Sequence, residues 1–158
     1  MKRTMTALLA LILAVGGALT ASAQDAKEID KAFAYLKTYE FGQDRAPLAV
    51  IADAALASIK DPALRASLLA RMSALLQQGC TIEAKRFLCR NLAVIGTGDS
   101  VPALVPLLQD ENVADHALKA LQEIPGAQAD AALLDALKQG TSAQQVAVIN
   151  ALARRGAT

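Results

Sequence analysis

Apolar residues recur at helical spacing through residues 99–126, the most regular stretch of the chain. A first run places Leu104, Leu107 and Leu108 on one helical face. Polar residues at 110–112 interrupt the run, and a second run ends at Pro125-Gly126. The apolar positions of the second run are Val113, Ala117, Leu118, Leu121 and Ile124. Because a short amphipathic pair cannot bury its own apolar faces, the pattern predicts further pairs on both sides.

The same pattern extends along the chain and predicts eight helices in four pairs. The pairs span residues 25–60, 61–97, 99–126 and 127–156. Gly96, Gly126 and Gly156 end three of the helices, thirty residues apart each time. At that offset Leu88 coincides with Leu118 and Val148, Leu104 with Leu134, and Leu107 with Leu137. No alternating strand pattern occurs in the sequence, so the predicted fold class is all-α.

Helix ends and inward faces follow from the same spacing. Asp61 is a predicted N-cap with Pro62 as the first helical residue, Ser100 caps the helix that contains Pro102, and Thr81 supplies half of a capping box. Further inward positions are expected at Leu48, Ile51, Leu56 and Ile59 in residues 44–60, and at Val146, Val148, Ile149 and Leu152 in residues 142–155. The helix within residues 25–42 is interpreted as a cap on the array, with a contact surface as the alternative.

Residues 1–23 have the organisation of a secretory signal peptide. Lys2 and Arg3 precede an apolar run, and Ala21-Ser22-Ala23 provides small residues before a cleavage site at Ala23-Gln24. The alternative is a membrane anchor, but the run is shorter than the ~20 residues that span a bilayer. We therefore expect an exported protein, periplasmic or extracellular after cleavage and not held in a membrane.

Composition and charge narrow the function classes. The chain is 54% hydrophobic but only 3% aromatic, with no Trp, which suits closely packed helices. Its formal net charge is +1, and without Lys2 and Arg3 the remaining 14 basic residues face 15 acidic ones. A nucleic-acid-binding protein would carry a strong basic excess. We therefore expect no nucleic-acid partner.

The sequence contains no constellation that supports catalysis. Cys80 and Cys89 lie nine residues apart on one predicted helix, ~13 Å along its axis, whereas a disulfide needs Cα atoms ~4.4–6.8 Å apart. We expect no bridge between them, with Cys89 buried and Cys80 a thiol whose pKa a helix N-terminus would lower. His116 is the only histidine and is interpreted as a surface residue. We expect no catalytic residue, metal or cofactor, and hence no enzyme.

The repeated unit resembles the HEAT-repeat family. The resemblance rests on Val101, Pro102, Leu104, Leu107, Leu108 and Asp110, followed by Ala120, Leu121 and Ile124. HEAT first helices are often kinked by a proline, and Pro106 matches that feature. The stretches at 85–97 and 100–110 resemble bacterial exported HEAT-repeat proteins. The resemblance implies a right-handed α-solenoid that contacts other proteins and brings no catalytic residues with it.

These observations predict a non-catalytic protein-interaction or scaffold module. Solenoid geometry would line a concave surface with residues 81–96, 111–124 and 142–155. The candidate binding residues on that surface are Arg86, Arg90, Asp115, Lys119, Gln122 and Gln145. Arg154 and Arg155 are interpreted as cations that complement the end of their own helix. The alternatives are an accessory lyase-like or chaperone-like HEAT protein and a structural homo-oligomer.

Overall fold

A computed structural model describes residues 25–156 of the chain. The predicted signal peptide and its cleavage site lie outside the described residues. Residues 25–36 are helical. The elements that follow are α2 (Ala46–Ala57), η1 (Ser58–Lys60), α3 (Pro62–Gln78), α4 (Ile82–Ile95), η2 (Gly98–Ser100), α5 (Val101–Leu104), η3 (Val105–Gln109), α6 (Ala114–Glu123), α7 (Ala127–Gln139) and α8 (Ser142–Arg155), where η marks a 3-10 helix.

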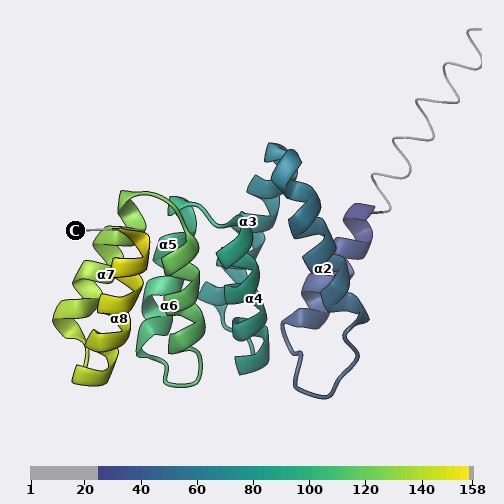
Figure 1. Ribbon diagram of the computed structural model, residues 1–158. Coiled ribbons are helices and arrows are strands. Elements are labelled where there is room, and N and C mark those ends of the chain that lie inside the picture. Colours follow the sequence, from purple (N-terminus) through teal and green to yellow (C-terminus); the bar gives the residue numbers. More distant parts are fainter. Residues whose placement is uncertain (1–24, 157–158) are drawn as a thin grey trace, which may run out of the picture.

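The helices form two layers of an α-solenoid, as the sequence predicts (Figure 1). The A layer holds helix 25–36, α3, α5 with η3, and α7, while the B layer holds α2, α4, α6 and α8. Among the B helices, α4 with α6 and α6 with α8 contact each other more extensively than their A-layer counterparts. The B layer is therefore the more closely packed side of the array. Residues 25–156 contain no strand and no helix both long and apolar enough to cross a membrane.

Short-range chemistry sets most helix ends. Asp61 Oδ1 accepts hydrogen bonds from the backbone N–H groups of Ala63 and Leu64, each at 3.0 Å, and Pro62 opens α3. Thr81 caps α4 by accepting from Ala84 N at 3.3 Å. These two caps are confirmed. Thr141 forms a complete capping box with Gln144 at the start of α8.

Two predictions about residues 99–110 are wrong in detail. Ser100 does not cap α5, because its backbone is already helical and its buried Oγ has no hydrogen-bond partner. Pro106 does not kink a continuous α-helix. The α-helix ends at Leu104 and the chain continues as a 3-10 helix, because Pro106 has no N–H to bond four residues back.

The repeat register differs from the even spacing of thirty. Leu88, Ala117 and Val148 occupy equivalent buried positions on α4, α6 and α8, and so do Leu92, Leu121 and Leu152. The offset is therefore 29 residues and then 31. The three glycines mislead because they play different roles: Gly96 follows α4 with a negative φ, Gly126 precedes α7 with φ 100°, and Gly156 follows α8 with φ 68°.

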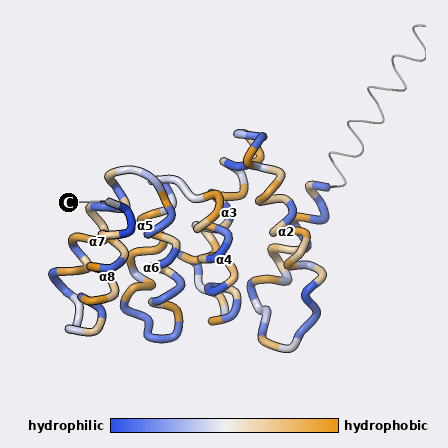
Figure 2. Tube along the Cα trace, in the orientation of Figure 1, coloured by the Kyte–Doolittle hydropathy of each residue, from blue (hydrophilic) through white to orange (hydrophobic). Residues whose placement is uncertain are grey.

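Several predicted core positions are exposed, each for a reason of its own. Leu133 and Leu134 were both expected to face inward. Leu133 is buried, as the equivalent of Leu104 at an offset of 29, whereas Leu134 is exposed. Val146 and Ile149 are exposed on α8, the last helix described, where no following pair covers them. Leu56 and Ile59 are exposed as well, because the buried face of this segment contains Ala55 and Ser58, and Leu56 and Ile59 each lie one residue beyond it. Along each helix in Figure 2, hydrophobic positions alternate with hydrophilic ones.

Candidate protein-binding surface

The solvent side of α4, α6 and α8, which we call the B-helix face, carries charged side chains together with the exposed Val94 and Val146. With the offsets of 29 and 31 residues, its side chains fall into rows that cross the helices. One row contains Arg86, Asp115 and Val146, and the next contains Arg90, Lys119 and Asn150. The row beyond holds Val94, Glu123 and Arg154. Among the predicted residues, Arg86, Arg90, Asp115 and Lys119 therefore share one surface.

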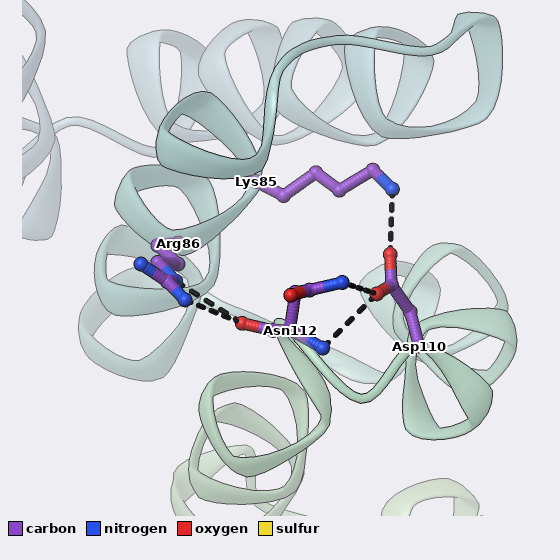
Figure 3. Close-up of polar contacts among 4 residues, drawn as sticks. All are labelled: Lys85, Arg86, Asp110 and Asn112. Atoms are coloured by element: carbon purple, nitrogen blue, oxygen red, sulfur yellow. Dashed lines mark hydrogen bonds and ion pairs between the residues drawn. The ribbon is translucent and has the colours of Figure 1, made fainter. Parts of the chain in front are cut away.

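Some basic residues of this region hold the repeats together (Figure 3). Lys85 Nζ lies 2.9 Å from Asp110 Oδ2, which joins α4 to the turn before α6. Arg86 donates from Nε and Nη2 to the Asn112 carbonyl at 3.1 and 3.0 Å, and its Nη1 lies 2.7 Å from Glu83 Oε1. Arg86 was predicted to be available for binding. Its donors are instead engaged within the array.

Asp110 also organises the turn that these bonds reach. Its Oδ1 accepts from the backbone N of Asn112 at 3.1 Å and from Asn112 Nδ2 at 3.2 Å. The hydrogen bond from Lys85 and those from Asn112 lower the pKa of the Asp110 carboxyl. Asp110 is therefore a carboxylate at neutral pH, and it fixes the carbonyl that Arg86 binds.

Two further arginines bind the carboxyl ends of neighbouring helices, a role that the sequence did not reveal. Arg65 on α3 donates to the carbonyls of Ile95 at 2.8 Å and Gly96 at 3.3 Å. Arg155 on α8 donates to the carbonyls of Leu121, Gln122, Ile124 and Gly126. Arg155 was expected to complement its own helix, but it completes the end of α6 instead. The sequence signal for this role was the position of each arginine about thirty residues from a glycine in a turn, Gly96 for Arg65 and Gly126 for Arg155.

Four of the predicted residues remain exposed to solvent or only locally bonded on the B-helix face. Arg90 is exposed, and its guanidinium carbon lies 6.0 Å from the centre of the Phe87 ring. Asp115 is exposed and forms no ion pair within residues 25–156. Lys119 pairs with Glu123 at 2.6 Å, and Gln122 Nε2 donates to the same carboxylate at 3.1 Å. Such exposed pairs on one helix break readily when a binding partner offers better contacts.

Gln145 does not belong to this surface. Its Nε2 donates to the Leu137 carbonyl at 3.1 Å, which ties the start of α8 to the end of α7. It is equivalent to Lys85 and Ala114 in the repeat register, so it lies beside the three rows of the B-helix face and not in one of them. Helical phase alone did not reveal this contact of Gln145 with α7.

His116 is half-buried on α6, with Arg86 and Arg90 of α4 nearby. Burial lowers its pKa, and the nearby charges of Arg90 and Arg86 lower it further against the opposing effect of Asp115 and Glu83. The imidazole is therefore neutral at pH 7. Among residues 25–156, no three His, Cys, Asp or Glu side chains converge as metal ligands.

The two cysteines are unbridged thiols in the structure. Burial raises the pKa of Cys80, and Lys85 and Lys37 offset this only in part. The predicted lowering of this pKa is wrong, because desolvation of the thiol outweighs the attraction of the two lysines. Cys89 is fully buried, and burial raises its pKa to about 12. Neither thiol has the depressed pKa of a reactive cysteine.

The comparison with protein families decides the classification. The model for HEAT repeats matches residues 69–153, just over half of the chain. The chain belongs to the HEAT-repeat family. HEAT repeats are generally protein-interaction scaffolds without catalytic residues. No curated protein and no solved structure matches the chain.

Proposed function

We propose that this HEAT-repeat protein is an exported, non-catalytic scaffold that binds a protein partner through the B-helix face. The observation that supports this most is that some of its charged side chains bind neighbouring repeats while others are left exposed on the surface. Lys85, Arg86 and Arg155 are engaged between repeats. Arg90 and Asp115, in adjacent rows of the same face, are not engaged in ion pairs within residues 25–156.

The contacts that Lys85, Arg86 and Arg155 make between repeats matter because they make the B-helix face rigid. A rigid surface loses little conformational entropy when a partner binds. Arg86 and Asp110 hold the turn before α6, and Arg155 fixes the end of α6 against α8. The polar row that contains Arg90 and Lys119 is therefore held in a fixed geometry on α4 and α6.

The mixture of charges on the face favours a folded protein as partner. Arg90, Lys119 and Arg154 lie near Asp115 and Glu123, so both signs alternate over a short span. Alternating charges give specificity for a complementary surface rather than attraction to a polyanion. We therefore propose a partner that carries interspersed acidic and basic residues.

Photo-crosslinking in the native cell tests this proposal. A photoreactive amino acid replaces Arg90 or Lys119 in the full chain, and the control replaces exposed Ala70 on the A-layer helix α3. The proposal predicts that one protein is captured from positions 90 and 119 but not from 70. Equal capture at all three positions would contradict it. Capture of many unrelated unfolded proteins would favour the chaperone-like alternative.

Export is a separate part of the proposal. It is supported by the basic, apolar and small-residue segments in residues 1–23. N-terminal sequencing of the protein recovered from the exported fraction would show Gln24 as its first residue. An uncleaved chain that begins at Met1 in the cytoplasm would refute export and leave the binding proposal standing.

A further inference from the structure

An apolar cavity of about 180 Å³ lies between α6 and α8, beside the turns that join the helices of the last two pairs. Apolar and small side chains form most of its wall: Leu108, Ala114, Leu118, Ala136, Ala147 and Val148. It is open to solvent, because the exposed residues Gln109, Asp115 and Ala143 also line it. An apolar cavity of ~150 Å³ holds one benzene ring. The α6–α8 cavity therefore has room for one phenyl ring.

The cavity exists because one side chain of the preceding repeat has no counterpart here. Lys85 and Ala114 are equivalent positions, since each follows a buried residue that matches in the register, Ala84 and Val113. Lys85 crosses to Asp110 of the next pair. Ala114 ends at its methyl group and leaves the corresponding space empty of protein. The opening is therefore specific to the α6–α8 interface.

A phenyl ring is displayed by the same chain. Phe41 is 88% exposed, the highest fraction among the large exposed hydrophobic residues. It lies in the loop at residues 37–45, which connects the helices of the first pair. An apolar ring of this size in water is unfavourable unless another surface covers it.

The loop holds Phe41 in a fixed position. Tyr35 Oη donates to the Asp44 carbonyl at 3.0 Å, and Glu40 N donates to Gln43 Oε1 at 3.0 Å. Thr81 N donates to the Lys37 carbonyl at 3.3 Å, which ties the loop to the turn before α4. A preorganised loop loses little entropy when its tip enters a cavity.

We propose that two copies of this chain associate in reciprocal fashion, each inserting Phe41 into the α6–α8 cavity of the other. The 37–45 loop and the α7–α8 turn lie on the same edge of the solenoid, at opposite ends (Figure 1). Two solenoids that meet antiparallel along this edge bring each loop to the other cavity, and two-fold symmetry closes the assembly.

Charge supports the same pairing. Arg45 follows Phe41 by four residues, is exposed, and forms no ion pair within residues 25–156. Asp115 at the cavity wall is equally exposed and unpaired within that range. Arg45 lies in the loop that carries Phe41 and Asp115 lines the cavity, so the two surfaces that would meet carry opposite charges. This association goes beyond the proposed partner binding and does not depend on it.

Sedimentation equilibrium of the protein purified from cells expressing the full chain tests the proposal. The wild type is expected to dimerise. F41S removes the ring that enters the cavity, and A114L fills the cavity with a larger side chain. Each is expected to weaken dimerisation by at least ~100-fold, since two contacts are lost per dimer. I59S removes another exposed apolar side chain and is expected to leave dimerisation unchanged.

Mixing the variants tests reciprocity. F41S keeps its cavity and A114L keeps its phenyl ring, so the mixture forms a heterodimer with one intact contact, whereas the F41S/A114L double variant does not dimerise. If A114L does not fold by circular dichroism, D115K replaces it as the cavity variant. A monomeric wild type, or dimers unaffected by either F41S or the cavity variant, would overturn the proposal.

Discussion

Arg155 Nε lies 2.6 Å from Oδ1 of Asp130, although the two residues are 25 positions apart and belong to different helices. The Arg155 side chain is only 8% exposed. Its other nitrogens donate to backbone carbonyls at the end of α6 and in the turn that follows. One guanidinium therefore satisfies the carboxyl end of one helix and a carboxylate on the next, which couples the last two pairs.

Replacing Arg155 with Met is expected to destabilise the fold by about 2–3 kcal/mol, because several part-buried carbonyls lose their donor. R154M is the matched control, since Arg154 is the exposed neighbour on the same helix. Its effect is expected to stay within about 0.5 kcal/mol. Urea unfolding of both variants measures the difference. Equal stabilities for the two would show that Arg155 does not couple the pairs.

Gly96 is expected to be intolerant of any side chain. A Cβ at this position would lie 2.2 Å from the Leu92 carbonyl oxygen and 2.6 Å from Ile124 Cγ1. Because both are fixed, G96A is expected to cost about 1–3 kcal/mol of unfolding free energy.

Gly98 provides the comparison for Gly96. A Cβ there would meet only the end of the Gln128 side chain, which is exposed and free to turn away. G98A is therefore expected to change the stability by less than about 0.5 kcal/mol. Thermal unfolding of the two variants is expected to give the lower melting temperature for G96A. A G98A protein less stable than G96A would refute the packing argument.

His116 gives the stability a defined pH dependence. Its pKa in the folded protein lies below the ordinary value of 6.5, so the unfolded chain binds more protons as the pH falls below that value. The His116 contribution therefore favours folding above pH 6.5 and is lost progressively as the pH falls from 6.5 to the folded pKa. H116Q should unfold with less pH dependence in that window than wild type, by urea titration at several pH values. An unchanged slope would show that burial does not perturb His116.

The two cysteines should react slowly with thiol reagents. Both pKa values are raised, so little thiolate is present at pH 8. We expect Cys80 to react with iodoacetamide more slowly than a free cysteine peptide, and Cys89 to react only after denaturation. Mass spectrometry of the alkylated peptides separates the two sites. Faster labelling of Cys80 than of the peptide would contradict the raised pKa and favour the lowering that the helix N-terminus predicted.

The sequence was sufficient for the fold because its signals are local. Apolar periodicity predicted the helices, while Asp61-Pro62 and Thr81 predicted helix starts that the structure confirms. The offset between equivalent residues of successive repeats could not be read from local signals. The equal spacing of Gly96, Gly126 and Gly156 indicated an offset of thirty, and only the matching burial of Leu88, Ala117 and Val148 shows 29 and then 31.

The candidate surface was predictable only in part for the same reason. Helical phase was enough to place Arg90, Asp115 and Lys119 on one side of α4 and α6. It could not show that Arg86 is used within the array or that Gln145 bonds to the Leu137 carbonyl. Such contacts join residues 8 to 34 positions apart. They depend on how helices pack, which a one-residue error in register obscures.

The binding role of the B-helix face is tested most directly by the affinity of the partner captured at positions 90 and 119. Isothermal titration would compare wild type with R90E and with K60E, which makes the same charge change at exposed Lys60 outside this face. The account predicts that R90E weakens binding by about tenfold or more and that K60E changes it less than about twofold. Equal effects of R90E and K60E would contradict the account.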